Sequence, residues 1–327
     1  MRRIYITFSG SVYDKTTKLI VRDGPRLGAD EVWVYDDVWL TMQEFYSHNH
    51  WLWEHHHKRG FGWYAWKPFI ILDALSRLEE GDIVLYTDAD TYPIRDLSAL
   101  YDRCARDGIM LFESSGEPHV KWCKRDCYIV MGQDEEKYHG GQHGVARFMA
   151  FQKGRWRPYQ FLMEWLAYCV NPLATTFDPS VLGKPELPGF VEHRTEQAIM
   201  TNLAHKYGYR LHREADQAGE GRTNDRDLYD QLFIQKDDWV KKTGRNMTAP
   251  VEGSAYRNIP GFKAEGNASQ KDVASGRRRD LGSRLIAIRN IAIVKTRRTL
   301  MKAAFRITPR PVKTFIKRRM GRLKRSV

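Results

Sequence analysis

Short apolar runs bounded by turn-forming residues recur along the first two thirds of the chain. The clearest run, residues 83–87, is apolar, aromatic or β-branched throughout and lies between Gly81 and Asp88. A run of this kind is typical of a strand buried in a parallel sheet. Further strands are predicted at residues 4–8, 31–35, 109–112, 145–151 and 207–212.

Helical patterns alternate with these runs. Residues 69–78 are almost wholly apolar and follow Pro68, which suits the first turn of a helix. Residues 159–170 alternate at helical spacing, and helices are also predicted at 97–106 and from residue 192 onward. We therefore expect an α/β domain of residues 1–242, in which helices flank a mixed, mostly parallel sheet of the Rossmann type.

The C-terminal region has a different composition. Residues 243–280 are rich in Gly, Ser and Asn, which predicts a flexible linker. Residues 281–327 place apolar side chains at helical spacing among Lys and Arg, which predicts a basic amphipathic helical extension. The net charge of +13 originates here, because residues 276–327 hold 18 Lys and Arg and one acid, whereas the remainder holds 35 basic and 39 acidic residues.

The basic extension indicates a class of partner. Basic amphipathic helices lie on anionic membrane surfaces, where each cation adds about 1 kcal/mol of binding. We expect residues 281–327 to bind an anionic membrane surface and not nucleic acid, the other polyanion that such a segment could bind. The alternative is a solvated tail without a partner. No apolar run is long enough to span a membrane, and residues 1–15 are too polar for a signal peptide.

The four cysteines are sparse and lack the paired spacing of a zinc site. Reduced thiols, as in a cytosolic protein, are the expected state. Together with the basic extension, this predicts a cytoplasmic protein that lies peripherally on the inner face of the cell membrane.

Two carboxylates follow the strand at residues 83–87. Asp88 and Asp90 lie at its carboxyl end, where open α/β sheets bind ligands. Two carboxylates at such a short separation repel each other unless a cation lies between them. We therefore expect a divalent metal site that binds a phosphorylated substrate, although acids at strand ends also serve simply as turn formers.

Other polar residues are candidates for the same site. Lys67 lies at the positive, N-terminal end of the helix at 69–78, where a cation is electrostatically unfavourable. An anion such as a diphosphate, bound between Lys67 and the free N–H groups of the helix, would account for it. The alternative is that the side chain extends to solvent. Asp36 and Asp37 end the strand at 31–35 and either meet a nucleotide base or ribose or cap the next helix. In the helix from residue 192, His193 and Gln197 share a face that Glu196 adjoins, which suits an active-site wall or a solvated helix start.

Five motifs in this order resemble a bacterial glycosyltransferase of the GT-A fold and of the metal-dependent Asp-x-Asp type, a family of uncharacterised polysaccharide-associated sequences. The motifs are GFGWYAWKP at 60–68, TDAD at 87–90, WCKRD at 122–126, EWLAYC at 164–169 and HRTEQ at 193–197. The resemblance implies a hexosyltransferase in surface polysaccharide synthesis. Its donor would be a nucleotide sugar, and its acceptor a glycan or a lipid-linked molecule.

The resemblance also implies roles for individual residues. Asp88 and Asp90 would hold Mn²⁺ or Mg²⁺ on the diphosphate, with His212 as a possible further ligand. Lys67 and Arg59 would lie near the phosphates, and Gln142 and Arg147 near the transferred sugar. Glu196 or Asp126 is the candidate base for the acceptor hydroxyl. Gln197 completes a pair that is usually Asp-Gln in similar sequences, whereas this chain has the longer Glu196.

Three alternatives have weaker support. A phosphatase of the haloacid-dehalogenase type would have Thr or Val at the position of Tyr92. A nucleotidyltransferase that makes nucleotide sugars would have a longer Gly-rich loop than Ser9-Gly10-Ser11. A basic membrane or nucleic-acid adaptor without enzymatic activity would leave Asp88 and Asp90 unexplained.

Overall fold

The structure of the protein is a computed structural model that describes residues 1–10, 14–54, 60–220 and 222–235. The predicted linker at 243–280, the basic extension at 281–327 and Arg59 lie outside these ranges, so the predictions for them stay open. Within the described ranges, no helix has both the length and the apolar content needed to cross a bilayer.

A six-stranded sheet runs through the domain in the order β2-β1-β3-β6-β5-β7. β1 pairs in parallel with β2 and β3, and β5 pairs in parallel with β7, whereas β6 is antiparallel to both of its neighbours. The strands are β1 (Arg3–Phe8), β2 (Glu31–Tyr35), β3 (Ile83–Asp88), β5 (Ile109–Pro118), β6 (Gln142–Gln152) and β7 (Leu211–His212). A second, two-stranded sheet pairs β4 (Thr91–Pro93) with β8 (Phe233–Gln235).

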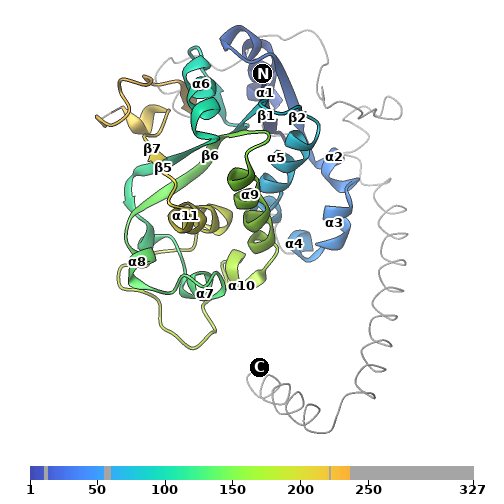
Figure 1. The fold of residues 1–327 in the computed structure, drawn as a ribbon. Coiled ribbons are helices and arrows are strands. Elements are labelled where there is room, and N and C mark those ends of the chain that lie inside the picture. The colour runs from blue at the N-terminus through green and yellow to red at the C-terminus, as the bar shows by residue number, and fades with distance from the viewer. Residues whose placement is uncertain (11–13, 55–59, 221, 236–327) are drawn as a thin grey trace. The chain divides into compact units, whose positions relative to one another are not determined.

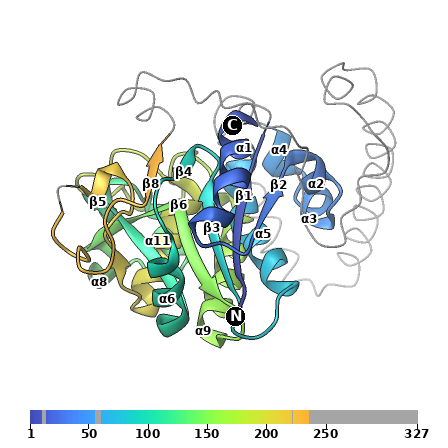
Figure 2. The same ribbon diagram turned by 90° about the horizontal axis from the view of Figure 1, so that it is seen from above.

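Helices cover both faces of the large sheet (Figures 1 and 2). This mixed, mostly parallel sheet between helices confirms the predicted GT-A-like α/β class. The helices are α1 (Asp14–Asp23), α2 (Asp37–Thr41), α3 (Glu44–His48), α4 (Trp51–Glu54), α5 (Trp66–Ser76), α6 (Ser98–Asp107), α7 (Arg125–Val130), α8 (Glu136–His139), α9 (Trp156–Cys169), α10 (Pro172–Thr175) and α11 (Thr195–Tyr207).

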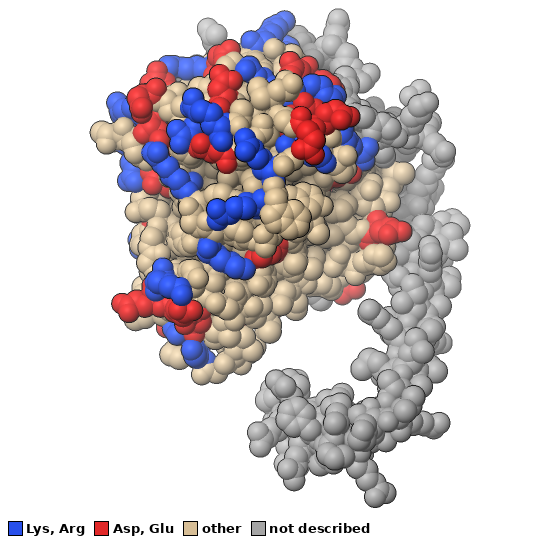
Figure 3. Space-filling model, in the orientation of Figure 1, with Lys and Arg blue, Asp and Glu red and all other residues tan. Residues whose placement is uncertain are grey.

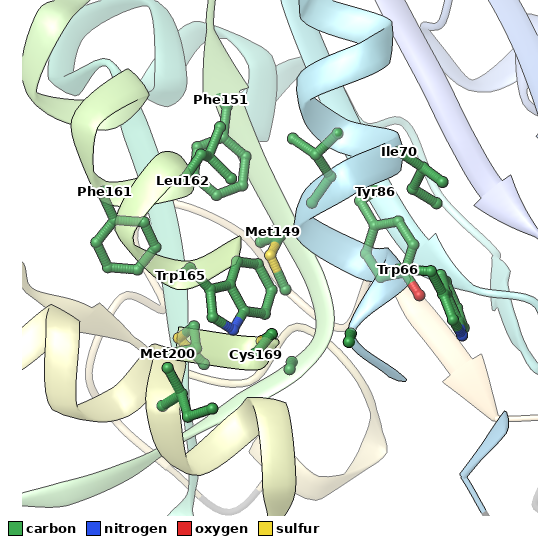
Figure 4. Close-up of a cluster of buried hydrophobic side chains, with 14 of the residues drawn as sticks. Trp66, Ile70, Tyr86, Met149, Phe151, Phe161, Leu162, Trp165, Cys169 and Met200 are labelled. Carbon is green, nitrogen blue, oxygen red and sulfur yellow. The ribbon is translucent and has the colours of Figure 1, made fainter. Parts of the chain in front are cut away.

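The alternation of side chains along each strand creates a separate core on each face of the sheet. On β3, Val84 and Tyr86 face the core beneath α5, α9 and α11, whereas Ile83 and Leu85 face the core beneath α1 and α6. Figure 4 shows Tyr86 beside Trp66 and Ile70 of α5, with Trp165 of α9 beside Met149 of β6. By the same alternation, Asp88 lies on the face of α5 and α11, which contribute the other polar side chains of the site.

The observed helices and strands have the centres that the sequence pattern predicts, but some of their ends differ from the predicted ones. The helix predicted from residue 192 begins at Thr195, because Arg194 has a non-helical backbone (φ −101°, ψ 38°) and Thr195 has a positive φ of 42°. The prediction that His193 shares a helical face with Gln197 is therefore wrong. His193 precedes the helix and is buried, with its Nε2 2.8 Å from the Ala174 carbonyl oxygen.

The tight turn before α5 requires a glycine at position 62. Gly62 has φ 57°, and a Cβ there would lie 1.7 Å from the ring of Trp53, which is held by stacking on Tyr46. Because that ring is buried and packed against other aromatic rings, we expect Gly62→Ala to lower the free energy of unfolding by about 3 kcal/mol. Gly132 has a similar φ of 65° with open space around it, so Gly132→Ala should cost only the strain of about 1–2 kcal/mol. Urea denaturation compares the two variants, and equal losses would contradict the steric argument.

Candidate active site

A cleft of about 710 Å³ opens at the carboxyl ends of β1 and β3. The turn before α5, the first turns of α5 and α11, and the middle of β6 form its walls. The lining residues are Phe8, Gly10, Asp37, Gly60, Phe61, Tyr64, Trp66, Lys67, Asp88, Ala89, Asp90, Val145, Arg147, Phe177, Arg194, Thr195, Glu196, Gln197 and Gln235.

Asp88 and Asp90 both lie in this cleft. The phenol of Tyr86, two residues earlier on the same face of β3, donates a hydrogen bond to Asp88 Oδ1. Asp90 accepts a hydrogen bond from the Thr91 hydroxyl at 3.2 Å. Burial, followed by the charge of Asp88, raises the pKa of Asp90 above its ordinary value. The site therefore favours a proton or a cation at Asp90.

Lys67 forms the electrostatic centre of the cleft wall. Its side chain is 4% exposed, and its Nζ lies 3.0 Å from Asp88 Oδ1, 3.0 Å from Glu196 Oε1 and 3.0 Å from the Ala146 carbonyl oxygen. Burial lowers the pKa of Lys67, but the two carboxylates outweigh it and raise that pKa above its usual range. The ammonium at the start of α5 is thus already paired with carboxylates from β3 and α11.

Glu196 occupies the first turn of α11 in a buried setting. Its carboxylate accepts a hydrogen bond from the hydroxyl of Thr195, and its backbone carbonyl accepts one from the Trp165 indole at 2.8 Å. Burial raises the pKa of Glu196, although Lys67 acts in the opposite direction. Thr195 and Tyr64, which both line the cleft, have positive φ angles of 42° and 57°. Strained backbone of this kind concentrates at functional sites.

Two arginines add positive charge to the rim. Arg147 of β6 is ion-paired with the buried Asp216. Arg194 lies over the ring of Trp122 at 4.5 Å and contacts Glu192 at 2.8 Å. With Lys67, the cleft holds three cations and four carboxylates, a formal excess of one negative charge. On the face of the molecule that Figure 3 shows, Lys and Arg are interspersed with Asp and Glu over the upper part, without a region of one sign.

Aromatic side chains form one wall of the cleft. Phe8 stacks on Trp66 with ring centroids 3.9 Å apart. Phe61 and Phe177, which also line the cleft, remain 38% and 42% exposed. Exposed aromatic faces beside charged groups suit a flat base or the apolar face of a sugar ring.

Several predicted site residues lie outside this cleft. Asp126 is buried at the start of α7, where its carboxylate accepts hydrogen bonds from the backbone N–H groups of Val181 and Leu182 at 2.7 and 3.0 Å. Asp36 caps α2 by accepting a hydrogen bond from the Trp39 backbone, and its neighbour Asp37 lines the cleft instead.

Gln142 and His212 are also elsewhere. Gln142 is exposed at the start of β6, before that strand reaches the cleft. His212 is buried on β7 with its Nδ1 3.3 Å from Asp225 Oδ2, and β5 and β6 separate β7 from β3. The structure thus brings together Asp88, Asp90, Lys67, Arg147, Glu196 and Gln197, but not Asp126, Asp36, Gln142 or His212.

Sequence reasoning missed the cleft residues Arg194 and Thr195, and it missed Tyr86, which is buried and donates a hydrogen bond to Asp88. Tyr86 could have been found, because a residue two positions before Asp88 on a strand shares its face. The other residues lie in a loop or at the start of a helix, where the direction of the side chain depends on tertiary packing.

The oxygen ligands in the cleft suit a hard divalent cation. Asp88 and Asp90 supply carboxylate oxygens only, the donor type that Mg²⁺ and Mn²⁺ prefer. In the part of the chain that the structure describes, no group of three or more His, Cys, Asp and Glu side chains could hold a metal ion. A cation between the two aspartates would therefore take its remaining ligands from water or a substrate, which is usual for Mg²⁺ bound with phosphates.

No protein-family model matches the sequence, and no curated relative matches it. Solved structures do match it, including these two. One is the apo structure of WbbM, a bifunctional glycosyltransferase, with 13% identity, a TM-score of 0.39, and coverage of 62% of this chain and 37% of that one. The other is apo mouse xyloside xylosyltransferase 1, with 10% identity, a TM-score of 0.41, and coverage of 72% and 97%. The chain thus spans little more than a third of the length of the first.

Proposed function

We propose that the protein is a metal-dependent glycosyltransferase that moves a sugar from a nucleotide-diphosphate sugar to a glycan or lipid-linked acceptor, in surface polysaccharide synthesis. One observation carries the proposal. Asp88 and Asp90, at the end of the central strand, face the same cleft as buried Glu196 and an aromatic wall.

Asp88 and Asp90 would hold Mn²⁺ or Mg²⁺. Without a cation, the carboxylates of the cleft exceed its ammonium and guanidinium groups by one charge, which disfavours a diphosphate. A divalent cation reverses that balance and matches the anionic donor. When bound, such an ion stabilises the negative charge that develops on the departing nucleoside diphosphate.

The chain's own residues would orient both substrates. Lys67 fixes Asp88 and Glu196 relative to each other through its two ion pairs. Glu196, whose pKa is raised by burial, is suited to accept the proton of the acceptor hydroxyl as that hydroxyl attacks. Arg147 adds positive charge beside Asp88, and the partly exposed Phe61 and Phe177 provide surfaces for the base and the sugar.

The proposal is tested by incubating the purified full chain with a panel of nucleotide sugars, with and without Mn²⁺, and measuring released nucleoside diphosphate. We expect release with one donor class, dependent on the metal. Release that is unaffected by EDTA would contradict the metal role, and absence of release across the panel, with glycan acceptors supplied, would contradict the transfer reaction.

For residues 281–327 we propose a peripheral position on the inner face of the cell membrane, supported by the basic composition of this segment. Deleting 281–327 should leave turnover of soluble substrates intact and should reduce co-sedimentation with anionic liposomes. Uncharged liposomes are the control. Unchanged co-sedimentation of the truncated chain would contradict membrane binding by this segment.

A further inference from the structure

Behind the cleft, Gln197 begins a row of hydrogen-bonded side chains that leads into the core. Its Nε2 lies 2.8 Å from His143 Nε2. His143 Nδ1 lies 2.9 Å from His119 Nδ1, and His119 Nε2 lies 2.9 Å from Asn202 Oδ1. These four residues come from α11, β6 and the segment before α7, and we call them the Gln197 relay.

The two histidines of the relay are buried. His119 is 0% and His143 2% exposed. Burial lowers the pKa of His119 to about 3 and that of His143 well below its ordinary value. Each ring is therefore neutral at pH 7 and offers one donor and one acceptor nitrogen. In a row of such groups, all hydrogen bonds must therefore be donated in the same direction along the row.

The inner end of the relay sets that direction. Asn202 Nδ2 lies 3.3 Å from the thioether sulfur of Met131, which accepts but cannot donate a hydrogen bond. The amide nitrogen of Asn202 therefore faces Met131, and its oxygen faces His119. His119 must then donate from Nε2 and accept at Nδ1, and His143 must donate from Nδ1 and accept at Nε2. Gln197 is left to donate from Nε2.

Thr201 gives the same direction independently. Its hydroxyl donates to the backbone carbonyl of Gln197 at 2.8 Å, so its proton is already engaged. The same oxygen lies 3.5 Å from His143 Nδ1 and can only accept there. His143 Nδ1 is thus the protonated nitrogen by both arguments.

We propose that the Gln197 relay fixes the carboxamide of Gln197 with Oε1 directed toward the cleft, so that this oxygen selects a substrate with a hydroxyl at that point. Gln197 lines the cleft, and within the described residues no group donates a hydrogen bond to its Oε1. Because a fixed acceptor rejects a ligand that lacks the matching donor, Gln197 is a specificity-determining residue and the two histidines are positioning residues. The identification of that ligand as a sugar rests on the proposed function, whereas the direction of the relay does not.

The direction is measured by nitrogen-15 NMR of the imidazole rings in the full chain labelled at histidine. We expect neutral rings between pH 6 and 8, with the proton on Nε2 of His119 and on Nδ1 of His143. The opposite pair of tautomers, or rapid exchange between the two, would overturn the proposal.

Two substitutions at the accessible end of the relay sharpen the test. In Gln197→Met the carboxamide is absent, and His143 should keep its Nδ1 proton because the inner end still dictates the tautomer. In Gln197→Glu the carboxylate can only accept a hydrogen bond at the position where the Gln197 amide donates to His143 Nε2. His143 should therefore acquire a proton on Nε2. Gln133→Leu, which removes only a hydrogen bond to the Asn202 backbone carbonyl, is the control and should change neither ring. A change of tautomer in Gln197→Met would place control at the cleft end and contradict the relay.

Selection is measured with donor and acceptor analogues that each lack one hydroxyl. For one analogue, kcat/KM of the wild type should fall about 10- to 100-fold, as expected for an unpaired hydrogen-bonding group, and that of Gln197→Met should change little. Equal penalties in both proteins for every analogue would contradict selection by Gln197. Expected tautomers without any sugar transfer would contradict the glycosyltransferase assignment and leave the relay intact.

Discussion

Replacing Asp90 by asparagine is expected to lower nucleotide-sugar turnover by about 1000-fold, because it removes one of the two carboxylates that would hold the cation at the leaving diphosphate. The fold should not suffer. Within the described residues, the Asp90 carboxylate accepts one hydrogen bond, from the Thr91 hydroxyl, and burial beside Asp88 disfavours its charged form. Turnover with saturating Mn²⁺ measures the loss, and activity within a few-fold of the wild type would contradict the metal role.

The same variant has a predicted stability profile. The pKa of Asp90 is raised in the folded state, so its contribution to stability is present below the ordinary value of 3.8 and is lost as the pH rises through the folded pKa. In EDTA, Asp90→Asn should therefore be at least as stable as the wild type at pH 7, and this gain should vanish below about pH 4. Asp102→Asn, at an exposed ion pair with Arg3, is the matched control and should leave turnover unchanged.

Replacing Lys67 by methionine is expected to cost about 3 kcal/mol of unfolding free energy at pH 7, the magnitude for leaving a buried charge without its partner. The substitution keeps most of the side-chain volume but leaves Glu196, 3% exposed, facing Asp88 without a cation. Asp88 is 31% exposed and contributes less, because solvent screens it. Urea denaturation measures the change.

A double variant separates charge from packing in this prediction. Adding Glu196→Gln to Lys67→Met should recover more than half of the lost stability, since the unpaired charge disappears. The deficit of the single variant should also shrink as the pH falls from 7 toward the ordinary Glu value of 4.5. Burial already raises the pKa of Glu196, and removing Lys67, which lowers that pKa, lets the carboxyl take a proton above pH 4.5. Additive effects, or a deficit independent of pH, would contradict the ion-pair account.

The sheet and its polar edge follow from local rules. The apolar run before Asp88 predicts a buried strand, and the carboxyl end of such a strand lies at the ligand-binding edge. These two facts suffice to place Asp88 and Asp90 in the cleft. Lys67 follows for a similar reason, because Pro68 marks the first turn of α5.

The remaining placements depend on packing that the sequence pattern does not contain. Lys67 meets Glu196 only because α5 and α11 pack on the same face of β3. His212 ends a strand as predicted, but that strand, β7, joins the sheet beyond β5 and not beside β3. Asp126 lies in α7, a helix that the apolar pattern did not predict, and its carboxylate is used by a loop.

The Gln197 relay shows the same limit for buried polar groups. His119, His143 and Asn202 lie on separate elements, and a lone histidine in a sequence gives no signal of its partner. Their hydrogen bonds arise because each buried polar group must find a partner inside the fold.

The central claim is that Asp88 and Asp90 hold a divalent cation to which a nucleoside diphosphate binds. Electron paramagnetic resonance of Mn²⁺ titrated into the full chain tests it most directly. The account predicts one bound Mn²⁺ per chain in the presence of nucleoside diphosphate, and none at that site in Asp90→Asn. An identical Mn²⁺ titration for the wild type and Asp90→Asn would contradict it.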